Sequence, residues 1–213
     1  MFESDIIFKK TCLEKNINVI HLNSSILKES INIALNRIGD KFNFNSYLAL
    51  GLNEVEFSNR KLLIFTTTTF SKTKRCSYDE EINLYLKYFT ENIPDDNSFL
   101  LFKFHPSAGE KINNIIFSIL FNKYGNRILF IEKFISAIPI EVILQFLIKN
   151  QIILETNITL FACSSGTAMP KSLFTKINLI ISFGKSFLFN ILNEQYLEKR
   201  LHQEDILKCK FKL

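Results

Sequence analysis

Short apolar runs alternate with segments of helical periodicity from residue 61 onward, and this alternation restricts the fold of the 213-residue chain more than any other feature. The runs lie at 61–67, 98–104, 127–132, 157–162 and 177–182. Apolar runs of this length, separated by helical segments, are typical of successive βα units whose strands form a mostly parallel sheet. We therefore expect an α/β fold with a Rossmann-like, mostly parallel, doubly wound sheet.

The helical segments between these runs have recognisable ends. Ser77 and Glu80 have the spacing of a capping box and predict a helix over 78–92. The amphipathic segment 109–124 ends before a glycine, which commonly stops a helix. A proline in a first-turn position predicts a further helix over 140–149.

The chain before residue 59 is less regular. It contains one segment with helical periodicity, at 24–38, and no clear succession of βα units. We therefore predict two parts, an N-terminal segment over 1–58 and a Rossmann-like domain over 59–213.

The charge balance favours anionic small molecules over nucleic acids. Lysine and arginine number 26 against 21 acidic residues, a formal net charge of +5, and the basic residues form no dense clusters. Such clusters are typical of nucleic-acid binders. We expect no nucleic-acid partner. With 47% hydrophobic residues the chain has ample apolar surface for a core, which excludes bulk disorder.

The four cysteines form no CxxC pair and the chain has three histidines, so neither a disulfide framework nor a metal site is indicated. The acidic N-terminus lacks the pattern of a signal peptide, and the longest apolar stretches are interrupted by charged residues, glycine or proline. We predict a cytoplasmic protein, with peripheral attachment to the inner membrane as the alternative. The basic residues at 208–213 are interpreted as a solvated end, and membrane contact is again the alternative.

The second apolar run ends in a lysine and is followed by a histidine, at the edge where a parallel sheet binds its ligands. Lys103 lies near the end of the run, and His105 stands directly before Pro106, which disfavours helical geometry at the histidine. A protonated imidazole at this position could bind a phosphate or donate a proton to a leaving oxygen. The alternative is a turn histidine that hydrogen-bonds only to the backbone.

Two serines follow the fourth run. Ser164 and Ser165 precede a glycine and a threonine at a strand-to-helix junction. Free backbone N–H groups at such a junction form a phosphate cradle, to which the two hydroxyls would add donors. The alternative is an ordinary helix N-cap and turn. Cys163, next to them, is interpreted as a small buried residue and not as a nucleophile.

An acidic residue opens the helix predicted over 140–149. Glu141 either complements the helix dipole or accepts hydrogen bonds from a ribose diol. The run of threonines at 66–69 ends the first strand on the same side of the sheet, with no role assigned to it.

Taken in order, these motifs resemble those of bacterial sialyltransferases with the GT-B architecture, of the lipooligosaccharide and polysialic acid types. Lys103-Phe104-His105-Pro106 resembles their K-x-H-P motif, and Ser164-Ser165 resembles their Ser-Ser motif. Pro139-Ile140-Glu141-Val142 lies between the two, as in the family. The resemblance covers about residues 60 to 205.

The resemblance implies a metal-independent glycosyltransferase whose donor substrate is CMP-sialic acid and which needs no cofactor. By the family pattern, His105, Ser164 and Ser165 would hold the departing CMP phosphate. Lys103 would lie beside the cytosine, and Glu141 would bind the ribose. This is stabilisation of a leaving group by placed donors.

The motif that would act on the acceptor is missing from this sequence. In the family the catalytic base belongs to a D/E-D/E-G motif, which this sequence lacks, and the nearest carboxylate in a similar context is Asp40. We therefore expect 1–58 to be the remnant of an acceptor-side domain, and the acceptor to be a lipooligosaccharide or capsular glycan. Two alternatives remain, a CMP-binding or interaction module without turnover and a transferase for another nucleotide sugar.

Overall fold

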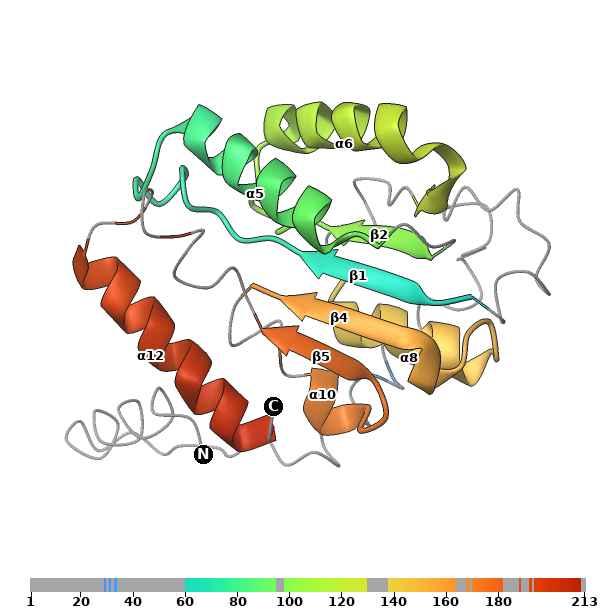
Figure 1. Ribbon diagram of the computed structural model, residues 1–213. Helices are drawn as coiled ribbons and strands as arrows, with labels where there is room; N and C mark the ends of the chain where they lie inside the picture. Colours follow the sequence, from blue (N-terminus) through green and yellow to red (C-terminus); the bar gives the residue numbers. More distant parts are fainter. Residues whose placement is uncertain are drawn as a thin grey trace.

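The computed structural model describes residues 60–94, 98–129, 138–163, 170–181 and 194–211, with the single positions 29, 31, 33, 168, 188 and 192. Within these residues, five parallel strands form one sheet in the order β3-β2-β1-β4-β5 (Figure 1). The strands are β1 (Leu62–Thr66), β2 (Phe99–Lys103), β3 (Ile128–Leu129), β4 (Ile158–Ala162) and β5 (Asn178–Ile181). The predicted Rossmann-like α/β fold is confirmed, and every strand lies within its predicted run.

The helices confirm most of the predicted ends. They are α5 (Tyr78–Asn92), α6 (Glu110–Tyr124), α8 (Ile140–Lys149), α10 (Pro170–Leu173) and α12 (Glu194–Phe211), with 3-10 turns η1 (Gly125–Arg127) and η2 (Glu155–Asn157). Helix α6 begins one residue later than predicted because Gly109 is its N-cap. Helices α10 and α12 were not predicted, and α12 includes most of the basic residues that were interpreted as a solvated end.

The first of these helices begins at a capping box, as its sequence predicts. The Ser77 hydroxyl accepts a hydrogen bond from the Glu80 N–H at 3.3 Å, and the Glu80 carboxylate accepts one from the Ser77 N–H at 2.6 Å. These bonds lower the pKa of Glu80. They satisfy two N–H groups that the helix itself cannot pair.

The sheet separates two core layers of different character. Helices α5 and α6 cover one face, where Phe65 stacks on Phe102 and both rings meet Phe89 edge to face. Helices α8 and α10 cover the other face, which is mostly aliphatic. Because β1 is buried on both faces, its residues read as a continuous apolar run instead of an alternating one.

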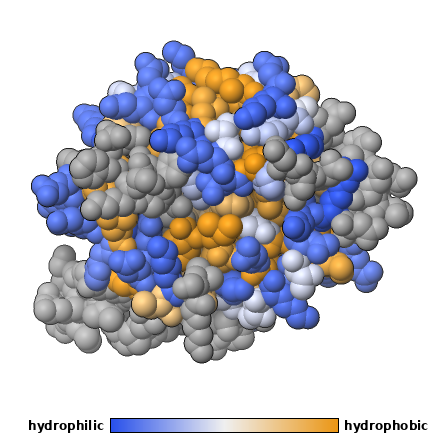
Figure 2. All heavy atoms as spheres, in the orientation of Figure 1, coloured by the Kyte–Doolittle hydropathy of each residue, from blue (hydrophilic) through white to orange (hydrophobic). Residues whose placement is uncertain are grey.

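The last helix touches both layers. Helix α12 runs beside β5 in Figure 1, and Leu197 belongs to the aromatic layer whereas Leu207 belongs to the aliphatic one. Among the described helices, none combines the length and the hydropathy that a membrane span requires. An apolar area lies over α6 in Figure 2, where Ile119 and Phe121 are exposed.

The order of the strands fixes where a ligand would be expected. From β1 the chain proceeds to β2 and β3 on one side, and then crosses to β4 and β5 on the other. The direction of winding therefore reverses between β1 and β4. In open parallel sheets, ligands bind beyond the carboxyl ends of the strands near such a reversal.

The N-terminal predictions lie mostly outside the described residues. Glu29, Ile31 and Ile33 are helical, in agreement with the helix predicted over 24–38. The division of the chain at residue 58 stays a prediction.

Candidate functional site

A cavity of about 220 Å³ lies at the carboxyl ends of β1 and β2, closed on one side by the start of α8. We call it the His–Pro cavity. Its lining residues are Thr66, Thr67, Lys103, Phe104, His105, Pro106, Ile138, Pro139, Ile140 and Glu141. The structure thus brings together Lys103, His105, Pro106 and Glu141, four residues that the sequence assigned to one site.

Hydrogen bonds beyond the strand ends hold the histidine turn against β1. The Thr67 N–H donates to the Lys103 carbonyl at 3.2 Å, and the His105 N–H donates to the Thr67 hydroxyl at 3.0 Å. The His105 carbonyl accepts a bond from the Ala108 N–H at 2.8 Å, which closes the turn around Pro106. The threonine run that had no predicted role therefore anchors the site.

The imidazole of His105 is held in one tautomer. Its Nδ1 accepts a hydrogen bond from the Ser107 N–H at 3.1 Å, which leaves the proton of the neutral ring on Nε2. Partial burial, with the nearby charges of Lys103 and Lys72, lowers the pKa of His105. Without a bound anion the ring is therefore neutral at pH 7 and offers Nε2–H as a donor, whereas the sequence hypothesis used the protonated form.

Lys103 and Glu141 both line this cavity, are partly desolvated, and influence each other electrostatically. Lys103 is buried, and its Nζ donates to the Phe104 carbonyl at 3.3 Å. Burial lowers the pKa of Lys103 to about 8, against the opposing effect of Glu141. Burial also raises the pKa of Glu141, against its own backbone N–H and Lys103. Titratable groups in a cleft whose pKa values are shifted by burial and by a specific charged partner are typical of functional sites.

The packing of α8 determines where Glu141 lies. Ile140, Val142, Ile143, Leu144 and Leu147 are buried, and all belong to the aliphatic layer under the sheet. Pro139 is the N-cap, makes no side-chain cap hydrogen bond, and lines the cavity together with Glu141. The burial of the apolar face of α8 therefore also fixes the position of its acidic residue.

The reversal point between β1 and β4 lies next to this cavity. The Thr66 hydroxyl donates to the Phe161 carbonyl at 2.9 Å and accepts from the Cys163 N–H at 3.2 Å. Cys163 is 1% exposed, which confirms its predicted burial. Ser164 and Ser165 follow directly in the chain, but both lie outside the described residues, as does Asp40. Their predicted roles stay predictions.

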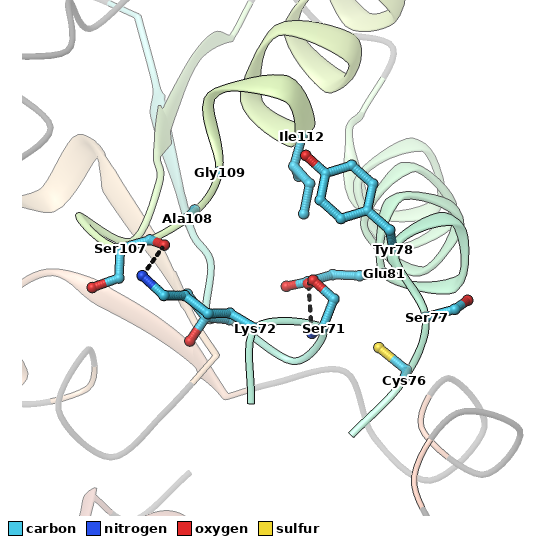
Figure 3. Close-up of a pocket in the computed structure, with 11 residues that line it drawn as sticks. Ser71, Lys72, Cys76, Ser77, Tyr78, Glu81, Ser107, Ala108, Gly109 and Ile112 are labelled. Carbon is cyan, nitrogen blue, oxygen red and sulfur yellow. Dashed lines mark hydrogen bonds between the residues drawn. The ribbon is translucent and has the colours of Figure 1, made fainter. Parts of the chain in front are cut away.

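A second and larger cavity, of about 540 Å³, lies between the loop that follows β1 and the loop that follows β2 (Figure 3). We call it the hydroxyl cavity. Its lining residues are Thr69, Ser71, Lys72, Cys76, Ser77, Tyr78, Glu81, Ser107, Ala108, Gly109 and Ile112. The sequence interpretation missed this cavity, because it used Ser77 and Tyr78 only as the start of a helix.

Buried polar side chains of α5 fix the loop that forms one wall of the hydroxyl cavity. The Glu81 carboxylate accepts hydrogen bonds from the Phe70 N–H at 3.0 Å, from the Ser71 N–H at 2.8 Å and from the Ser71 hydroxyl. The Tyr85 hydroxyl accepts from the Thr68 N–H at 2.8 Å and donates to the Thr68 carbonyl at 3.0 Å. These bonds hold the loop in one conformation.

Comparisons with protein-family models, with curated proteins and with solved structures found no match. Among the residues that the structure describes, no group of three or more histidine, cysteine, aspartate or glutamate side chains could hold a metal ion.

Proposed function

We propose that this chain is a glycosyltransferase of the bacterial sialyltransferase type, which binds CMP-sialic acid at the His–Pro cavity and transfers the sugar to a glycan acceptor. One observation carries the proposal. A single cavity at the carboxyl edge of a Rossmann-like sheet gathers Lys103, His105, Pro106 and Glu141. These are the described residues that the resemblance assigns to the nucleotide, although they come from distant parts of the sequence.

The chemistry of the cavity suits the departure of a phosphate. When the bond between the anomeric carbon and the phosphate oxygen breaks, negative charge accumulates on CMP. The Nε2–H of His105 would donate a hydrogen bond to that phosphate, and its pKa would rise as the anion approaches. Lys103 would add a positive charge near the nucleotide, and the hydroxyls of Ser164 and Ser165 would complete the set of donors.

The environment of Glu141 suits a ribose. A carboxylate that has lost part of its hydration gains from hydroxyl donors that replace the water. The two ribose hydroxyls provide such donors in the geometry of a diol. Binding of the ribose would therefore offset the cost of burying Glu141, and the pKa of Glu141 would fall when the nucleotide binds.

A CMP-binding module without turnover is the second candidate, and one observation favours it. The sequence lacks the D/E-D/E-G motif to which the catalytic base of the resembled family belongs, so the site for the departing nucleotide is better represented than the machinery for transfer. If Asp40 does serve as the base, it would take the proton from the acceptor hydroxyl as that oxygen attacks the anomeric carbon.

Calorimetric titration of CMP, UMP and GMP into the folded chain tests the proposed donor site. We expect CMP to bind more tightly than UMP or GMP, and His105→Ala and Glu141→Gln each to weaken CMP binding by about ten-fold, the loss typical of one hydrogen bond to a charged group. His202→Ala and Glu91→Gln change the same residue types at exposed positions elsewhere and should leave binding unchanged.

Chromatographic detection of sialylated product, from CMP-sialic acid and a panel of oligosaccharide acceptors, separates the two candidates. Product that disappears in Asp40→Asn supports the transferase, whereas CMP binding without product supports the module. Equal affinity for all three nucleotides, or an unchanged affinity in both site variants, would contradict the assignment of the His–Pro cavity.

A further inference from the structure

The hydroxyl cavity shares no lining residue with the His–Pro cavity, although one turn of the chain separates them. Residues 104–106 line the smaller cavity, and residues 107–109 line the larger one. Its volume of about 540 Å³ lies within the 300–1,000 Å³ that is usual for small-molecule sites. The hydroxyl cavity can therefore hold a ligand of its own.

The lining of the hydroxyl cavity combines hydroxyl groups with an apolar surface. Thr69, Ser71, Ser77 and Ser107 provide aliphatic hydroxyls. Figure 3 shows Tyr78 beside Ile112, so that the phenol ring and an aliphatic side chain form a continuous apolar wall. Hydroxyl groups opposite an aromatic ring suit a ligand that has polar edges and an apolar face.

Charge is distributed unevenly along the hydroxyl cavity. At one end the Lys72 Nζ donates to the Ser107 carbonyl at 3.3 Å, and the Lys72 charge is one cause of the lowered pKa of His105. At the other end, burial with the charges of Glu81 and Glu80 raises the pKa of Cys76 to about 12. One end therefore attracts a negative group and the other repels it.

The buried acid limits what the negative end can bind. A carboxylate has about four acceptor positions, and the Glu81 carboxylate already accepts three hydrogen bonds from Phe70 and Ser71. The Tyr85 hydroxyl also forms a side-chain hydrogen bond with Glu81, so the carboxylate has little capacity left for a ligand. A compact dianion would be repelled here, whereas a neutral polyol part would not.

We propose that the hydroxyl cavity binds an acidic sugar ring, with its carboxylate at Lys72, its hydroxyls toward Ser71 and Ser77, and an apolar face of the ring against Tyr78. The choice of a sugar among polar carboxylic acids rests on the proposed glycosyltransferase function. The cavity itself, its charge gradient and its aromatic wall are independent of CMP binding.

Ligand-observed saturation-transfer NMR tests this inference, with N-acetylneuraminic acid, glucuronic acid and glucose as probes. We expect both acidic sugars to bind more tightly than glucose. Lys72→Gln should weaken the acidic sugars by about ten-fold, the loss typical of one charge-assisted hydrogen bond, and leave glucose unchanged. Lys87→Gln removes the same charge from an exposed position on α5 and serves as the matched control.

Two variants of Tyr78 test the aromatic wall of the hydroxyl cavity. Tyr78→Ala should weaken all three sugars, whereas Tyr78→Phe keeps the ring and should retain most of the binding. Thermal melting of both variants reports whether the start of α5 remains folded. Because Tyr78→Phe preserves the packing, its sugar binding can be measured even where the alanine variant does not fold.

CMP titrated into the same samples separates this inference from the proposed function. Sugar binding without CMP binding would support the hydroxyl cavity and contradict the nucleotide site, and the reverse result would overturn the present inference alone. The inference would also be overturned if Lys72→Gln and Lys87→Gln had equal effects, or if His105→Ala removed sugar binding, because the sugar would then lie in the His–Pro cavity.

Discussion

Two glutamates near the same edge of the sheet have opposite surroundings. Glu81 is 1% exposed, and the loop after β1 saturates most of its acceptor positions. Glu141 is only half-buried, lines the same cavity as Lys103, and has a raised pKa because burial removes part of its hydration. The difference indicates that the deeper carboxylate is structural, whereas the shallower one retains hydrogen-bonding capacity for a ligand.

Removal of Glu81 should have the largest effect on stability. Glu81→Ala leaves the buried N–H groups of Phe70 and Ser71 without their acceptor, so we expect the free energy of unfolding to fall by about 3 kcal/mol. Urea denaturation measures this loss. Glu91→Ala, at an exposed position on the same helix, is the control. A loss below about 1 kcal/mol would show that Glu81 does not hold the loop.

Removal of Lys103 should separate binding from stability. Lys103→Met keeps the volume of the side chain and removes a charge whose pKa is lowered by burial, so the free energy of unfolding at pH 7 should rise, by about 3 kcal/mol at most. The affinity for CMP should fall about ten-fold, because the nucleotide loses a nearby cation. Calorimetry measures the affinity for CMP and urea denaturation measures the free energy of unfolding, both on one preparation. A large loss of stability with unchanged CMP affinity would assign Lys103 to the same structural class as Glu81.

The pH dependence of the free energy of unfolding also tests the surroundings of Lys103. The pKa of Lys103 falls from 10.5 to about 8 on folding, so between these values the unfolded chain binds more protons than the folded chain. Stability should therefore rise with pH in that window, by about 1 kcal/mol from pH 8 to pH 9. The difference between the wild-type and Lys103→Met unfolding curves isolates this contribution, and parallel curves would contradict it.

The smallest expected effect concerns the titration of His105. Its pKa lies below the usual 6.5, so the ring should lose its proton below that pH. Lys72→Gln removes one cause of this shift and should move the pKa of His105 upward, as measured by the imidazole proton resonances. An unchanged pKa of His105 would show that Lys72 lies too far from the ring to connect the two cavities electrostatically.

Most of the fold could be predicted because local signals and tertiary packing agree. Ser77 and Glu80 form the capping box that their spacing predicts, and the helix that they begin ends at Asn92 as expected. Helix α12 was not predicted because its mean hydropathy is low and its apolar residues are sparse. Its position depends on contacts of Leu197 and Leu207 with two distant layers, which a local pattern does not contain.

The candidate site could be predicted in part for the same reason. His105 and Glu141 follow strand and helix boundaries that the sequence marks, and parallel strands bring those boundaries to one edge. Glu81 was overlooked, although it stands four residues before Tyr85 and thus on the same buried helix face. A carboxylate in such a stripe is a signal of a buried hydrogen-bonding centre. The protonation of His105 depends on Ser107 and Lys72 in space, which sequence alone does not give.

The position of α12 has a consequence for how the chain is made. Since α12 contributes Leu197 to one core layer and Leu207 to the other, neither layer is complete until the last described helix has left the ribosome. Before that point β5, at the edge of the described sheet, offers unpaired N–H and C=O groups to other nascent chains. During synthesis, protection from aggregation therefore depends on α12 and not on the His–Pro cavity.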